Sequence, residues 1–167
     1  VSGDALTDVN LLKLISEHRS SGALATIALK EVGEVEQFGV VITDEAGRIE
    51  DFQEKPPREK ARSNLANTGI YIFEPEIFDY IPENAFYDFG KQVFPHLVSV
   101  KAPFYGVKIS DYWCDIGSLQ TYFTAHNDLL SGRIRIRLPA SLEATSDGGK
   151  LLKGEGVFIG SDVVFAG

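Results

Sequence analysis

The sequence predicts an α/β fold built around a mixed β-sheet, and three observations favour it. Short apolar, β-branched segments alternate along the chain with amphipathic segments of helical period. A hairpin in the middle adds antiparallel strands to this alternation. Several polar motifs follow directly after predicted strands, which is where sheets of this class gather their ligands.

In the first half of the chain, one helix and four strands are predicted. Asp8 is suited to cap a helix whose apolar positions share one face, and Gly22 is suited to end it. A turn at 44–47 joins the two arms of the hairpin, because its glycine supplies the positive φ that such turns need. A polar loop is predicted at 58–63. The predicted strands are 23–30, 38–43, 48–53 and 67–73.

In the second half, Pro75 suits the first turn of a short helix, and Asp88 is predicted to cap another that Pro95 ends. Residues 104–109 are predicted to form a strand and residues 112–117 a compact turn. Ser118 then caps a helix that Gly132 ends. The apolar residues that share a face of this last helix are Leu119, Tyr122, Phe123, Leu129 and Leu130.

The chain changes character after Gly132. Residues 133–150 are charged and then small and polar, so they are predicted to be a linker between a main domain at 1–132 and a last piece at 151–167. In that last piece, apolar and small turn residues recur about every six positions, as in the coils of a parallel β-helix. Fewer than two coils are present, and the first residues look like the end of a strand. We therefore expect the chain to be part of a longer protein.

The composition limits the classes of partner. The chain has 167 residues, with a hydrophobic fraction of 44% and a formal net charge of -8, which suits a globular domain and argues against a nucleic-acid surface. No apolar run approaches the roughly 18–20 residues that span a bilayer, so a membrane partner is not predicted either. The single cysteine, Cys114, excludes an internal disulfide and suits a cytoplasmic protein.

Two aspartates are candidate metal ligands. Asp4 follows a probable strand end in the motif Ser-Gly-Asp, and Asp115 lies in Trp-Cys-Asp-Ile-Gly just before a helix. Taken singly, each aspartate is better explained as a turn residue or a helix cap. Magnesium, however, prefers one or two carboxylates completed by substrate phosphates. The pair is therefore sufficient as the protein's part of a magnesium site.

Four further positions suit a phosphorylated ligand. Lys55 stands at a strand end before two prolines, where it can meet a phosphate as a point charge, and Glu54 beside it can accept hydrogen bonds from hydroxyls. Gly39 interrupts a strand, which often marks the close approach of a ligand. Asn67 and Gly69 open the strand at 67–73. The alternative for each is a structural loop or strand residue.

The order of these motifs resembles the sugar-1-phosphate nucleotidyltransferases. The chain reads SGD, FGVVITDEAGRIEDFQEKP, ANTGIYIF and YWCDIG, followed by a helix that ends HNDLLSG, and the resemblance covers residues 1–132. It implies a Rossmann-like, GT-A-like catalytic domain with its N-terminal part missing. The tail resembles the start of the left-handed β-helix that many of these enzymes carry, through which a homo-oligomer could form.

The resemblance also implies roles for the residues. Asp4 and Asp115 would bind magnesium, Lys55 would contact the sugar phosphate, and Glu54 would contact the sugar. Gly39, Asn67 and Gly69 would line the sugar pocket. The substrates would be a nucleoside triphosphate and a sugar 1-phosphate, with mannose 1-phosphate and GTP slightly favoured over glucose 1-phosphate.

One departure from the family pattern is large. The Gly-rich signature that binds the triphosphate does not occur, so the chain alone is expected to be inactive. Two other classes remain open: a non-catalytic regulatory subunit with the same fold, and a glycosyltransferase on a similar sheet. The retention of Asp4, Lys55 and Asp115 favours the catalytic class over the regulatory one.

Overall fold

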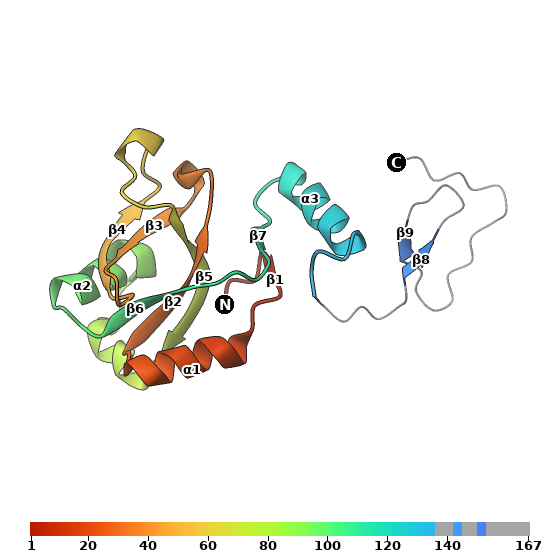
Figure 1. Cartoon of the computed structure of the whole chain (residues 1–167). Helices are drawn as coiled ribbons and strands as arrows, with labels where there is room; N and C mark the ends of the chain where they lie inside the picture. The colour runs from red at the N-terminus through yellow and green to blue at the C-terminus, as the bar shows by residue number, and fades with distance from the viewer. Residues whose placement is uncertain (136–141, 145–149, 153–167) are drawn as a thin grey trace.

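A mixed sheet of five strands forms the centre of the molecule. The structure is a computed structural model that describes residues 1–135, 142–144 and 150–152 (Figure 1). The strand order is β4-β3-β5-β2-β6; β2 and β6 are parallel and the other neighbours antiparallel. This confirms the predicted mixed α/β sheet. The strands are β2 (Ala25–Glu31), β3 (Gly39–Thr43), β4 (Ile49–Glu54), β5 (Leu65–Phe73) and β6 (Phe104–Lys108).

Helical segments cover both faces of this sheet (Figure 1). Because side chains alternate along a strand, Ile27 of β2 packs with the segment formed by the π-turn η4 (Phe89–Val93) and α2 (Phe94–Ser99), whereas Ala28 packs with Leu14 of α1 (Leu11–Ser21). Burial on both faces explains why β2 is a nearly continuous apolar run. Short 3₁₀ turns join the strands: η1 (Val35–Gln37), η2 (Arg58–Lys60) and η3 (Pro75–Tyr80).

The first helix differs from the prediction at its start. Asn10, and not Asp8, is the N-cap, and its side chain accepts a hydrogen bond from the backbone N–H of Lys13. The Asp8 side chain is instead 2% exposed and bound elsewhere. Leu12 is 80% exposed, so the apolar positions are not all on the buried face. Gly22 ends the helix at φ 61, as predicted.

Two other boundaries also differ from the prediction. Pro95 does not end a helix; it lies in the first turn of α2, where a missing N–H costs no intrahelical hydrogen bond. Residues 112–117 are not only a turn, because Trp113–Asp115 form the strand β7, which pairs antiparallel with β1 (Ala5–Thr7). Sequence periodicity cannot detect a three-residue strand, since it has no period to show.

The last helix among the described residues is α3 (Leu119–Leu130), and it begins in a capping box between Ser118 and Thr121, as predicted for Ser118. Its buried residues are Ala125 and Asp128, whereas Leu119 is 78% exposed. Beyond it, β8 (Leu142–Ala144) pairs with β9 (Lys150–Leu152). The predicted β-helix start at 151–167 lies almost entirely outside the described residues. In the described part of the chain, no helix has the length and apolarity to cross a membrane.

Candidate active site

The two predicted metal ligands, Asp4 and Asp115, lie at the same end of the small β1–β7 ladder. In that ladder Ala5 is the partner of Asp115, and the backbone N–H of Ile116 donates to the Asp4 carbonyl over 3.1 Å. The Ser2 hydroxyl donates to the Asp4 carboxylate. Residues more than a hundred positions apart in the sequence are therefore adjacent in space, in the arrangement that the sequence could only suggest.

The electrostatics link these aspartates to Lys55. Burial raises the pKa of Asp115, the neighbouring Asp4 charge raises it further, and the charge of Lys55 acts in the opposite direction. The Ser2 hydrogen bond lowers the pKa of Asp4. Two carboxylates whose charges repel, with only one partly compensating cation, form a site whose charge balance a divalent cation would improve.

The donor chemistry fits magnesium. Asp4 is exposed and Asp115 half-buried, so both offer hard oxygen ligands at an accessible strand end. Among the residues that the structure describes, no cluster of three or more His, Cys, Asp or Glu side chains could hold a metal alone. A two-carboxylate set matches magnesium, which commonly completes its shell with water and substrate phosphates.

Lys55 has a strained backbone. Its φ is 45°, in the left-handed region that non-glycine residues rarely adopt, and its N–H donates to the Phe38 carbonyl over 3.1 Å. The following Pro56 is buried and anchors the turn. Such strain costs about 1–3 kcal/mol and concentrates at functional positions, where the surrounding structure maintains it. The strain supports a functional role for this lysine.

Gly39 and Glu54 are direct partners across the hairpin formed by β3 and β4. A Cβ atom on Gly39 would stand 2.6 Å from Cζ of Phe52 and 3.1 Å from Oε2 of Glu54. The sequence suggested that this glycine admits a ligand. The structure gives a different reason, because the space beside Gly39 is already filled by the Phe52 ring and the Glu54 carboxylate.

The side chain of Asn67 forms two hydrogen bonds to other residues of the protein. Its side-chain oxygen accepts from the Gly69 N–H over 3.0 Å, and its amide donates to the Tyr71 hydroxyl over 3.0 Å. Gly69 has φ 74° and its carbonyl accepts from the Ser2 N–H over 3.0 Å. Asn67 therefore supports Tyr71, and Gly69 supports the Ser-Gly-Asp segment.

Three residues near Glu54 were not predicted from the sequence: Tyr71, Asp88 and Gly90. Burial raises the pKa of Tyr71; the Asn67 hydrogen bond opposes this, and the charges of Asp88 and Glu54 add to it. A Cβ atom on Gly90 would stand 3.5 Å from the Asp88 carboxylate and 3.7 Å from that of Glu54. The Asp-Phe-Gly sequence at 88–90 was the available signal, but Asp88 was assigned only the capping role that it also performs.

Trp113 attaches the metal-ligand strand to the main sheet. Its indole N–H donates to the Thr68 carbonyl over 3.0 Å, and its ring packs edge-on against Phe38 at 5.4 Å between centroids. Thr68 lies in β5, and Phe38 precedes β3. One side chain thus joins β7, β5 and the start of the hairpin, which brings the strand ends of the candidate site together.

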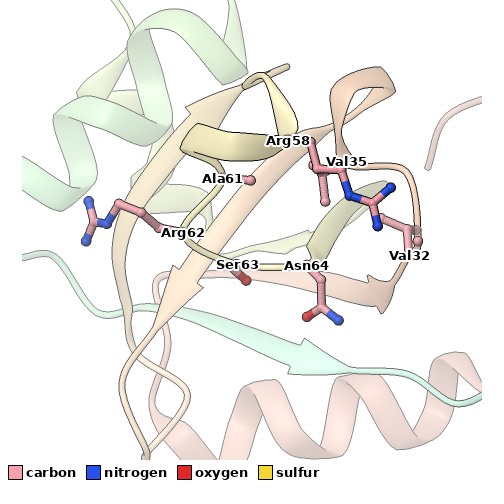
Figure 2. Close-up of a pocket in the computed structure, with 8 residues that line it drawn as sticks. Val32, Val35, Arg58, Ala61, Arg62, Ser63 and Asn64 are labelled. Atoms are coloured by element: carbon pink, nitrogen blue, oxygen red, sulfur yellow. The ribbon is translucent and has the colours of Figure 1, made fainter.

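An open hollow of about 470 Å³ elsewhere on the surface contains none of the predicted site residues (Figure 2). Residues 32–35 form one of its sides and residues 58–64 the other. The Arg62 side chain points away from Arg58 in Figure 2 and pairs with Asp51. The Ser63 hydroxyl accepts from the Leu65 N–H over 3.1 Å. Arg62 thus ties this loop to β4, and Ser63 supports the start of β5; the candidate active site is the strand-end cluster, where the predicted residues lie.

The comparisons with known proteins show the family of the chain. The family model described as nucleotidyl transferase matches residues 1–132. The chain is 47% identical over 140 residues to a UTP–glucose-1-phosphate uridylyltransferase of Synechocystis, covering 82% of this chain and 36% of the relative. It is 42% identical over 139 residues to a glucose-1-phosphate adenylyltransferase of Thermotoga neapolitana, covering 78% and 32%.

Solved structures show the same fold. An apo UDP-glucose pyrophosphorylase superposes with a TM-score of 0.62 at 27% identity, covering 78% of this chain and 52% of that one. A protein of Bacillus anthracis superposes with a TM-score of 0.64 at 22% identity, covering 81% and 54%, which shows the fold alone.

The family match over residues 1–132 and the similarity to these relatives define the class. The chain belongs to the nucleotidyl transferase family, and its relatives are named as enzymes acting on sugar 1-phosphates. It spans about a third of the length of the curated relatives that it matches.

Proposed function

We propose that the protein containing this chain transfers a nucleotidyl group from a nucleoside triphosphate to glucose 1-phosphate and releases pyrophosphate. The observation that carries the proposal is the β1–β7 register, which places Asp4 beside Asp115, with the charge of Lys55 acting on the Asp115 carboxyl. The relatives favour glucose 1-phosphate over the mannose 1-phosphate favoured by the sequence, because both are named for glucose 1-phosphate. Their names differ in the nucleotide, so the base stays open between uracil and adenine.

The reaction is an in-line displacement. An oxygen of the sugar phosphate attacks the α-phosphorus of the triphosphate, the bond to the bridging oxygen breaks, and pyrophosphate leaves. The attacking oxygen is already anionic, so no general base is required. Catalysis then consists of positioning the reactants and stabilising the charge that is transferred.

The residues of this chain have separate parts in that reaction. Lys55 neutralises and orients the sugar phosphate, and its constrained backbone fixes the direction in which its side chain leaves the main chain. Glu54 accepts hydrogen bonds from sugar hydroxyls, with Asp88 and Tyr71 beside it as further polar groups of the pocket. Asp4 and Asp115 would hold magnesium, which when bound offsets charge on the phosphates.

We also propose that these 167 residues do not catalyse the reaction by themselves. The Gly-rich segment that the family resemblance assigns to the triphosphate is not in the sequence. Homo-oligomerisation and a cytoplasmic location stay predictions.

The test is pyrophosphate release by the complete protein across a panel of nucleoside triphosphates and sugar 1-phosphates. Asp115→Asn should raise the magnesium requirement and Lys55→Ala should raise the KM for the sugar phosphate. Lys60→Ala is the matched control, because this exposed lysine lies five residues further along the same loop. Turnover that is unaffected by both variants would refute the site. If the complete protein folds but releases no pyrophosphate with any pair of substrates, the result would favour the regulatory alternative.

A further inference from the structure

Tyr112, the residue before β7, is bound from three directions. Its backbone N–H donates to Asp8 Oδ1 over 2.7 Å. Its carbonyl accepts from the Thr7 hydroxyl over 2.7 Å and from the Asp8 N–H over 3.3 Å. Its phenol donates to Asp128 Oδ2 over 2.8 Å. This residue therefore connects the end of β1, the start of β7 and the end of α3.

Asp8 is a buried carboxylate with a full set of donors. Its side chain is 2% exposed. Oδ2 accepts from the Arg135 backbone N–H over 2.8 Å and from the Arg135 Nε over 3.2 Å. Arg135, 73% exposed, also reaches Asp111 over 2.6 Å. A buried charge needs such partners, so the backbone that supplies them is held in place.

Asp128, near the end of α3, is a second largely buried carboxylate, and it links this helix to Tyr112. Its side chain is 10% exposed and accepts from Arg133 over 2.6 Å as well as from the Tyr112 phenol. The Arg133 N–H also donates to the Asp128 carbonyl over 3.0 Å. Residues 133–135, which follow α3, are thus attached to the entry of β7 through two separate carboxylates.

The position of these contacts matters because the β1–β7 ladder is short. Its register pairs only Thr7 with Trp113, Leu6 with Cys114 and Ala5 with Asp115. Three residue pairs stabilise a register weakly, and a slip by one residue would turn the Asp115 side chain to the opposite face of the ladder. The contacts of Tyr112 and Asp8 lie immediately beyond the last pair, where they can prevent such a slip.

We propose that Asp8, Tyr112 and Asp128 form a register clamp that positions Asp115 beside Asp4, and that Arg135 makes this positioning depend on the segment after α3. These are positioning residues, since none of them belongs to the metal-ligand or sugar-pocket residues assigned above. The inference rests on the proposed function for its kinetic consequence. The clamp itself can be tested independently of that function.

The decisive variant is Tyr112→Phe, which removes only the phenolic hydroxyl. In the complete protein, the magnesium concentration for half-maximal rate should rise about tenfold, as for other groups that orient metal ligands, while kcat at saturating magnesium recovers. Arg135→Ala should raise it roughly threefold, since the guanidinium is exposed and the backbone N–H of residue 135 still donates to the Asp8 carboxylate. Hydrogen exchange of peptides covering 1–8 and 110–117 should accelerate in both variants.

Arg62→Ala is the matched control for Arg135→Ala, because Arg62 is also an exposed arginine paired with a carboxylate, Asp51. It should change neither readout. If Tyr112→Phe does not fold, Arg135→Ala gives the answer alone, because its side chain lies at the surface. Unchanged hydrogen exchange at 110–117, or a lower kcat with an unchanged magnesium requirement, would overturn the clamp. An unmodified protein without turnover but with accelerated exchange in the variants would overturn the proposed function and leave the clamp standing.

Discussion

The Ser2 N–H donates to the Gly69 carbonyl over 3.0 Å, and the two residues are so close that a Cβ atom on Gly69 would stand 2.9 Å from the Ser2 Cβ. This contact places the Ser-Gly-Asp segment directly on β5. Because Asp4 is two residues further along, the glycine in β5 determines where one of the two candidate metal ligands can lie.

Gly69→Ala should therefore have two costs. The positive φ of 74° makes an alanine strained by about 1–2 kcal/mol, and the collision with Ser2 adds about 1–3 kcal/mol. Gly22→Ala is the control, since Gly22 has φ 61° with nothing within 4 Å of an added Cβ. Urea unfolding of both variants measures the difference. Equal losses of stability in the two variants would show that the collision with Ser2 contributes nothing to the loss.

Gly39→Ala should weaken the use of the sugar phosphate more than it weakens the fold. The added methyl group would stand 2.6 Å from Cζ of Phe52 and 3.1 Å from Oε2 of Glu54, so the Phe52 ring must move and the Glu54 carboxylate must also give way slightly. We expect the KM for the sugar 1-phosphate to rise by roughly tenfold, which corresponds to about 1.4 kcal/mol. Gly33→Ala, with nothing within 4 Å of its added Cβ, should leave that KM unchanged.

Lys55→Gly should separate backbone strain from charge. Relief of a left-handed lysine, worth about 1–2 kcal/mol, offsets the flexibility that glycine adds to the unfolded chain, about 0.5–1 kcal/mol. Thermal unfolding should therefore show no loss of stability, while the KM for the sugar phosphate rises. Lys101→Gly, at φ 54°, should behave alike in unfolding without any kinetic change. A kinetic defect in both variants would contradict the role of Lys55.

Asp8 should contribute stability that depends on pH. Burial alone would raise the pKa of Asp8, but the hydrogen bonds from Arg135 and Tyr112, together with the Arg135 charge, outweigh it and lower the pKa below its ordinary value. A carboxyl with a lowered folded pKa stabilises fully above its unfolded pKa of about 4, and this contribution is lost as the pH falls through the folded pKa.

The comparison with Asp8→Asn measures this contribution. Urea unfolding of the two proteins between pH 7 and pH 3 should give a stability difference that is constant above about pH 5 and then shrinks with acidity. Asp111 also faces Arg135, so Asp111→Asn is the control for the more exposed partner. A difference that grows as the pH falls would have the wrong sign for a lowered pKa.

The sequence by itself determined much of this protein. Short apolar segments bounded by turn residues predicted the strands of the mixed sheet within one or two residues, because a strand that is buried on one or both faces must carry apolar side chains there. Ser118 and Gly22 marked the start of α3 and the end of α1 through local cap chemistry. The order of four short motifs indicated the family.

The tertiary structure alone decided what joins these parts. Asp8 is a residue type that often caps helices, yet its buried side chain holds Tyr112 and Arg135. These partners are more than a hundred residues away in sequence, so no local pattern could indicate this role. Tyr71 and Asp88 lie near Glu54 although they come from other segments of the chain. Local preferences are set by neighbours in the chain, whereas contacts between distant residues depend on how the strands pair, and no local pattern records that pairing.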